Sequence, residues 1–170
     1  NMSGKTYRQN MNETRSMRVI ADHMRGAVMM ITDGVVPSNK QQGYMLRKLI
    51  RRSMLHAKQL GIAKSEVFIE TLVTPVVSIF ESAYPETKAQ QQQTTQIITD
   101  EAVRFEKTIE KGLKEIEKMD VIDGNKAFVL YETYGFPWEL TEEIAVSKGQ
   151  QVNRKQFEDA FRQHQQLSRT

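Results

Sequence analysis

The chain has 170 residues, enough for one ordinary domain, and its 39% hydrophobic and 26% charged residues fit the globular class rather than a disordered or fibrous one. No apolar run approaches the roughly 20 residues of a membrane-spanning helix, and the absence of cysteine excludes a disulfide framework, a thiolate zinc site and a thiol nucleophile. The net charge of +3 divides unevenly, with +9 from 12 Lys/Arg and 3 Asp/Glu in residues 1–65 and −6 from 12 and 18 in residues 66–170, which favours a polyanionic partner for the first part.

The first predicted helix covers residues Arg15–Thr32, with Thr14 as its N-cap and Gly34 as its C-terminal stop. A short loop follows, and Pro37 stiffens it because proline fixes its own φ and restricts the residue before it. The sequence therefore predicts that a rigid loop presents the amide side chain of Asn39 just before the next helix.

The second predicted helix, Tyr44–Leu60, separates into an apolar and a basic face at 100° per residue. The basic face carries Arg47, Lys48, Arg51 and Arg52. No acidic residue lies between these four cations in the sequence, so their mutual repulsion disfavours the helix unless a partner offsets it. Phosphates would do so while releasing counterions, and a nucleic-acid surface is therefore favoured over a merely solvated helix face.

The third predicted helix starts after Ser65 and runs to Tyr84, kinked or interrupted by Pro75. A longer helix follows over residues 86–119, in which apolar positions alternate at spacings of four and three. These positions are Ile98, Ala102, Phe105, Ile109, Gly112, Ile116 and Met119. Such a heptad seam predicts half of a helical hairpin or a coiled-coil-like arm.

Residues 123–170 are predicted to hold the last helices. Asp123 caps a helix over Gly124–Tyr134 that Gly135 ends, and Trp138 opens the next. The final helix begins with a capping box of Asn153 and Gln156 and a hydrophobic staple of Val152 and Phe157. With no convincing strand and no internal repeat, the sequence predicts one all-α domain over residues 1–170, a helical bundle with a long arm.

The polar residues that stand out also have plain structural interpretations. An asparagine in a Pro-Ser-Asn turn, as at Asn39, usually serves turn geometry. Glu132 near a helix end is more often a surface charge, and His23 beside Asp22 is better explained as a structural histidine. No set of residues resembles a nucleophile–base pair, a phosphate-binding glycine loop or a catalytic carboxylate pair, so no catalysis by this chain is expected.

Several long motifs, kept in order from Arg18 onward, closely resemble the alanyl-tRNA synthetase family. They are RVIADHMR (Arg18–Arg25), DGVVPSN (Asp33–Asn39), GYMLRKLIRR (Gly43–Arg52), LYETYGFP (Leu130–Pro137) and LTEEIA (Leu140–Ala145). The resemblance implies the helical middle portion of the enzyme, which is implicated in recognising the tRNA acceptor stem. Family members attach alanine to tRNA(Ala) through an alanyl-adenylate.

The resemblance also implies roles for individual residues. In the family an asparagine before the basic helix and an aspartate in the YDTYGFP motif read the G·U wobble pair of the acceptor stem. The first falls on Asn39, and the second on Glu132, which is longer by one methylene. In a G·U pair the guanine 2-amino group is an unpaired donor in the wide minor groove of A-form RNA, and an amide or carboxylate oxygen can accept from it. Arg47, Lys48, Arg51 and Arg52 are then expected to contact phosphates.

The remaining expectations follow from the same resemblance. No cofactor is expected in this chain, because ATP and Mg²⁺ belong to the family's catalytic domain and zinc to its editing domain. Expected partners are the acceptor stem of tRNA(Ala) and those two domains, in the cytoplasm and without a membrane. The alternative is a helical protein–protein interaction module in which the heptad arm binds a partner.

Overall fold

The computed structural model describes residues 2–62 and 65–167, and this part of the chain folds into eight α-helices without a strand. The predicted all-α class is confirmed. Two compact units are present, Asn1–Arg104 and Phe105–Thr170, and the boundary between them falls inside one helix. The sequence predicts three parts, 1–65, 86–119 and 123–170, which are divided between predicted helices. None of these divisions coincides with the boundary between the two units. No described helix is long and apolar enough to cross a bilayer.

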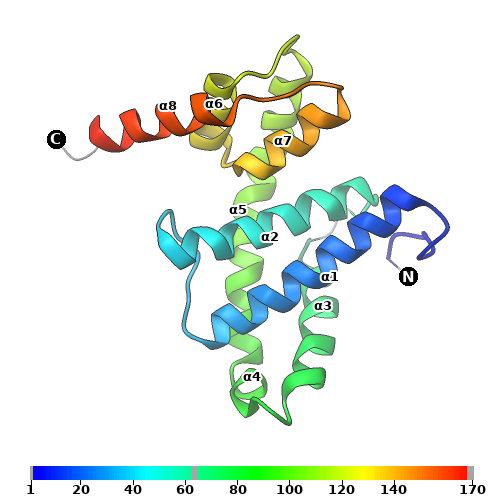
Figure 1. Cartoon of the computed structure of the whole chain (residues 1–170). Coiled ribbons are helices and arrows are strands. Elements are labelled where there is room, and N and C mark those ends of the chain that lie inside the picture. Colours follow the sequence, from blue (N-terminus) through cyan, green and yellow to red (C-terminus); the bar gives the residue numbers. More distant parts are fainter. Residues whose placement is uncertain (1, 63–64, 168–170) are drawn as a thin grey trace. The chain divides into compact units, whose positions relative to one another are not determined.

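The first unit contains α1 (Met11–Thr32), α2 (Gln41–Gln59), α3 (Ser65–Phe80), α4 (Pro85–Ala89) and the first part of α5 (Gln91–Glu117). In Figure 1, α1 lies beside α2, while α4 links α3 to α5 as a hairpin. The predicted apolar stripes are its core: Ile20, Met24, Ala27, Val28, Ile31, Leu46, Ile50, Met54, Ala57 and Leu60 are buried.

Both helices that flank the Asn39 loop begin earlier than predicted. Asn10, not Thr14, caps α1, because its side chain accepts hydrogen bonds from the backbone amides of the first turn. The hydroxyl of Thr14 instead accepts from the backbone amide of Arg8 at 2.9 Å. Helix α2 begins at Gln41 instead of Tyr44, directly after Lys40. The predicted stop at Gly34 is confirmed by its φ of +85°, which favours glycine.

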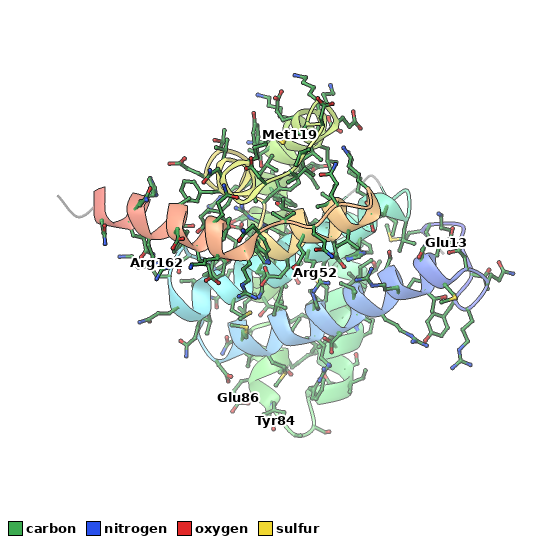
Figure 2. The ribbon with its side chains drawn as sticks, turned by 45° about the horizontal axis from the view of Figure 1, so that its top comes forward. Glu13, Arg52, Tyr84, Glu86, Met119 and Arg162 are labelled. Carbon is green, nitrogen blue, oxygen red and sulfur yellow. The ribbon has the colours of Figure 1, made fainter. Side chains whose placement is uncertain are left out.

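The hairpin of the first unit differs from its prediction in two places. Helix α3 contains Pro75 but ends at Phe80, so the chain turns before Tyr84 instead of after it. Tyr84 follows this turn as the N-cap of α4, and Glu86 lies in the first turn of α4 (Figure 2). The predicted single helix over residues 86–119 is divided at Gln90, which separates α4 from α5, although Thr94 still donates its amide to the Gln90 carbonyl at 2.8 Å.

The second unit packs α6 (Gly124–Tyr134), α7 (Trp138–Ser147) and α8 (Arg154–Leu167), with α6 against α8 (Figure 1). The predicted caps are confirmed at Asp123, which accepts from the Lys126 amide, and at Gly135 with φ of +70°. Asn153 accepts from the Gln156 amide as expected, but the Gln156 side chain accepts from the Gly124 amide instead of completing the capping box.

The heptad seam is buried inside the chain's own units along α5, whereas its last predicted position, Met119, lies beyond the end of α5 and is half-buried. In the first unit Ile98 and Ala102 are buried, and in the second unit Phe105, Ile109, Gly112 and Ile116 are buried. The ring of Phe105 meets that of Phe136 edge to face, with centroids 5.7 Å apart. A seam already filled by its own chain offers no apolar stripe to another protein, so the alternative of a partner-binding arm is not favoured.

Candidate nucleic-acid interface

The loop that carries Asn39 is held against the first turn of α2 by a close backbone approach. The Ser38 amide donates to the Gly43 carbonyl at 3.1 Å. A Cβ added at Gly43 would lie 2.1 Å from the Ser38 Oγ and 2.5 Å from the Val36 carbonyl oxygen, so only glycine fits here. The side chain of Asn39 is exposed at the end of this anchored loop.

Replacing Gly43 by alanine is therefore expected to force the loop off α2 and lower the free energy of unfolding by about 1–3 kcal/mol. Urea-induced unfolding followed by circular dichroism measures this loss. Gly26→Ala is the matched control, because a Cβ at Gly26 meets only the Leu49 Cδ1 at 3.4 Å and alanine is the better helix former. Unchanged stability of the Gly43→Ala variant would show that the loop is not held in this way.

Arg47 connects the exposed amide to the interior of the first unit. Its Nη1 donates to the Asn39 Oδ1, and its Nε lies 3.1 Å from the Oε1 of Glu101 on α5. Arg51, one turn further along α2, also binds Glu101, with its Nη2 at 2.6 Å and its Nε at 2.7 Å from the same oxygen. The structure thus brings Asn39 and two of the four predicted cations into one connected group.

Glu101 lies deeper than the two arginines it binds. Its side chain is 1% exposed, against 13% for Arg51 and 20% for Arg47. A buried carboxylate is strongly unfavourable unless cations and hydrogen bonds compensate it. The sequence of α2 has no acid among its four cations, but Glu101 of α5 lies beside two of them. Its negative charge therefore neutralises part of the predicted basic face.

The other two cations of the basic face, Lys48 and Arg52, are half-buried. Arg52 (Figure 2) places its Nη1 3.4 Å from the Nε2 of His23 on α1. Burial lowers the pKa of His23, and the positive charge of Arg52 lowers the pKa further. His23 is thereby favoured in its neutral form, consistent with the predicted structural role.

Glu132 belongs to the second unit, whereas Asn39 belongs to the first. It lies on the last turns of α6, is exposed, and places its Oε1 2.9 Å from the Nε2 of His164 on α8. Next to it, Tyr131 packs with the aromatic cluster of Phe128, Phe157 and Phe161. Glu132 therefore projects from a helix that the neighbouring Tyr131 anchors to the aromatic cluster.

Sequence reasoning missed Glu101, although the pattern held a signal. Glu101 lies three residues after Ile98 and four before Phe105, which is helical spacing along the edge of the buried seam. An acid there is placed for burial and needs a cation from a neighbouring element. Which helix supplies that cation depends on the tertiary packing of α5 against α2, and no local pattern contains this information.

The group can accept and donate hydrogen bonds. Oxygen acceptors and guanidinium donors are fixed on helices, as suits recognition of a polar surface. Across residues 2–62 and 65–167, no cluster of three or more His, Asp or Glu side chains is placed to hold a metal ion.

The chain matches known proteins over its whole length. The family model of class II tRNA synthetases (A) matches residues 1–170. Alanine–tRNA ligases of Thermotoga petrophila, Pediococcus pentosaceus and Caldicellulosiruptor saccharolyticus are 41%, 38% and 38% identical over 99% of this chain. The chain spans about a fifth of the length of these relatives, 20% in each case. The matches over the full chain, together with its all-α fold, place this protein in the class II tRNA synthetase (A) family.

Proposed function

We propose that the chain is part of an alanine–tRNA ligase and binds the acceptor stem of tRNA(Ala) in the cytoplasm. One observation carries the proposal: an exposed Asn39 amide is fixed by Arg47 at the start of a helix rich in cations. Binding of this kind needs cations for the phosphates and a rigid polar group for a base edge. Both are present within the first unit.

Asn39 is proposed to accept a hydrogen bond from the guanine 2-amino group of the G·U pair. An amide oxygen has two lone pairs, so the Asn39 Oδ1 can accept from Arg47 and from the base together. The bond from Arg47 is charge-assisted and directional, which holds the oxygen in one orientation before RNA arrives. A fixed acceptor discriminates better than a freely rotating one because less ordering is left to binding.

Arg47, Lys48, Arg51 and Arg52 are proposed to contact phosphates. All four are half-buried, so part of each side chain reaches the surface. An arginine carries five N–H donors, more than the contacts of Arg47 with Glu101 and Asn39 require. The excess of positive charge in residues 1–65 supports the same assignment.

Glu132 is proposed as a second reader of the wobble pair, on the strength of the resemblance of Leu130–Pro137 to the family motif. Its Oε1 faces His164, and a carboxylate has a second oxygen with which to accept from a base. A carboxylate close to a phosphate backbone is otherwise unfavourable, so its presence there is best explained by a base donor.

The chemistry of the whole ligase is a further part of the proposal. The relatives' name implies attachment of alanine to tRNA, which in the family uses ATP with Mg²⁺ in a catalytic domain and zinc in an editing domain. This chain would contribute recognition and no catalytic group. Its partners within the ligase would be those two domains.

A binding titration tests the proposal. The 170-residue chain is titrated with acceptor-stem hairpins that carry either G·U or G·C at the wobble position, at several salt concentrations. We expect tighter binding of the G·U hairpin and a steep fall in affinity with salt, because phosphate contacts release counterions. Salt-insensitive binding would contradict the phosphate contacts, and equal affinity for both hairpins would contradict base reading.

Replacing Asn39 by alanine is expected to reduce the preference for the G·U hairpin by about 1–3 kcal/mol and to leave the salt dependence unchanged. The variant loses the acceptor but keeps every cation. Asn125→Ala, which removes an exposed asparagine side chain from α6, is the control and should bind like the unmodified chain. If Asn39→Ala weakens both hairpins equally, Asn39 acts only as a turn residue.

A further inference from the structure

Glu101 joins the basic face of α2 to the interior of the first unit, and the proposed recognition gives it no role of its own. We propose that Glu101 is a positioning residue for base reading, acting through Arg47 on Asn39. This inference rests on the proposed function, because it assigns the residue that keeps Asn39 selective. Glu101 is held in the interior, Glu101 holds Arg47, and Arg47 orients Asn39.

Glu101 is fixed by its place on α5. Its neighbours at helical spacing, Ile98 and Phe105, are fully buried, and its own side chain is 1% exposed. A residue held by buried neighbours on the same helix face has little room to change its rotamer. The carboxylate is therefore a stationary anchor point in the interior.

Glu101 fixes Arg47 through a shared oxygen. The Glu101 Oε1 lies 2.6 Å from the Arg51 Nη2 and 3.1 Å from the Arg47 Nε. It therefore lies between two guanidinium groups from adjacent turns of α2. Its negative charge offsets the repulsion between these two cations. Without the carboxylate, each guanidinium would turn toward water, because both lie near the surface.

Arg47 in turn orients the side chain of Asn39. The Nε of the rigid guanidinium plane lies 3.1 Å from the Glu101 Oε1 in an ion pair, and its Nη1 donates to Asn39, so the ion pair restricts the direction of the bond to Asn39. A lysine offers a single ammonium group on a flexible stem and cannot bridge two acceptors in this planar way. The exposed amide is thus oriented from the interior, and the loop backbone alone does not set its rotamer.

Glu101 has two expected effects on RNA binding, one on the affinity and one on the selectivity. As a local negative charge, it weakens phosphate binding, so Glu101→Gln should leave affinity for the G·C hairpin unchanged or raise it. As a positioning residue, it sharpens selectivity, so the same change should lower the G·U to G·C affinity ratio. We expect this ratio to fall about threefold or more.

The test is a double-mutant cycle on the 170-residue chain, with both hairpins at one salt concentration. Affinity ratios are measured for the unmodified chain, Glu101→Gln, Asn39→Ala and the combined variant. If Glu101 acts through Asn39, Glu101→Gln lowers the ratio in the unmodified chain and has no further effect once Asn39 is alanine. Glu70→Gln, which removes an exposed acid from α3, makes the same charge change and should leave the ratio intact.

Arg47→Lys provides a second variant, which keeps the charge and leaves the buried acid in place. It should reduce the ratio as Glu101→Gln does, and circular dichroism checks the fold of each variant. A ratio unchanged by both Glu101→Gln and Arg47→Lys, or a loss that persists in the Asn39→Ala background, overturns the inference. A chain that shows no preference for the G·U hairpin before mutation would instead overturn the proposed function.

Discussion

Replacing Arg47 and Arg51 together by methionine is expected to lower the free energy of unfolding by about 3–5 kcal/mol. Both arginines bind the Oε1 of Glu101, and its Oε2 is buried without a hydrogen-bond partner in the described part of the chain. The double replacement would leave a charged carboxylate in an apolar interior with neither cation. Urea-induced unfolding followed by far-ultraviolet circular dichroism measures the loss.

Two further variants separate this cause from others. Adding Glu101→Leu to the double replacement should recover most of the lost stability, because removing a buried ion group entirely is often neutral or stabilising. Lys107→Met with Lys111→Met removes two exposed cations of α5 and should change the unfolding free energy by less than about 0.5 kcal/mol per site. If the triple variant is as unstable as the double one, the arginines stabilise the fold by some means other than pairing with Glu101.

This buried pairing changes the interpretation of the basic face. The sequence of α2 shows four cations without an acid, which favours a polyanion as the compensating partner. In the structure, two of the four already share an acid from α5, fifty and fifty-four residues away along the chain. Their mutual repulsion alone is therefore not evidence for RNA. The stronger support comes from the exposed Asn39 amide and from the charge excess of residues 1–65 as a whole.

Features set by nearby residues were predictable from the sequence. Gly34, Gly61 and Gly135 end their helices with positive φ, and Asp123 and Asn153 cap the helices that follow them. Each of these depends on the backbone within one turn, where residue type is decisive. The apolar stripes of the first two helices were predictable for the same reason, because helical periodicity alone determines them.

Some features depend on competition between two possible caps or on contacts between residues far apart in the sequence, and these were not predictable. Asn10 and Thr14 are both good caps, and the helix starts at the earlier one, while Thr14 bonds to Arg8. The capping box at Asn153 is incomplete because the Gln156 side chain accepts a hydrogen bond from the Gly124 amide, 32 positions away. The pairing of Glu101 with α2 is of the same kind. Its helical spacing is visible in the sequence, but its partners are determined by packing.

The heptad seam shows why a pattern alone does not identify a binding surface. An apolar stripe at alternating spacings of four and three fits equally well against another protein and against the chain's own helices. In the second unit the seam is filled by Phe136, which is fully buried and lies against Phe105. A Cβ at Gly112 would come within 2.4 Å of the Phe136 ring, so the missing side chain of Gly112 makes room for it.

Replacing Phe136 by alanine should therefore lower the free energy of unfolding by about 3–5 kcal/mol, the cost of an emptied aromatic site. Val146→Ala, on an exposed position of α7, is the control and should have little effect in the same urea titration. If the seam of α5 served to bind another protein, the Phe136→Ala variant would keep its free energy of unfolding and lose only the binding of that protein. A large loss of stability in Phe136→Ala would mean that the apolar seam of α5 belongs to the core of the second unit. Asn39 and the cations of α2 would then have to account for the proposed recognition.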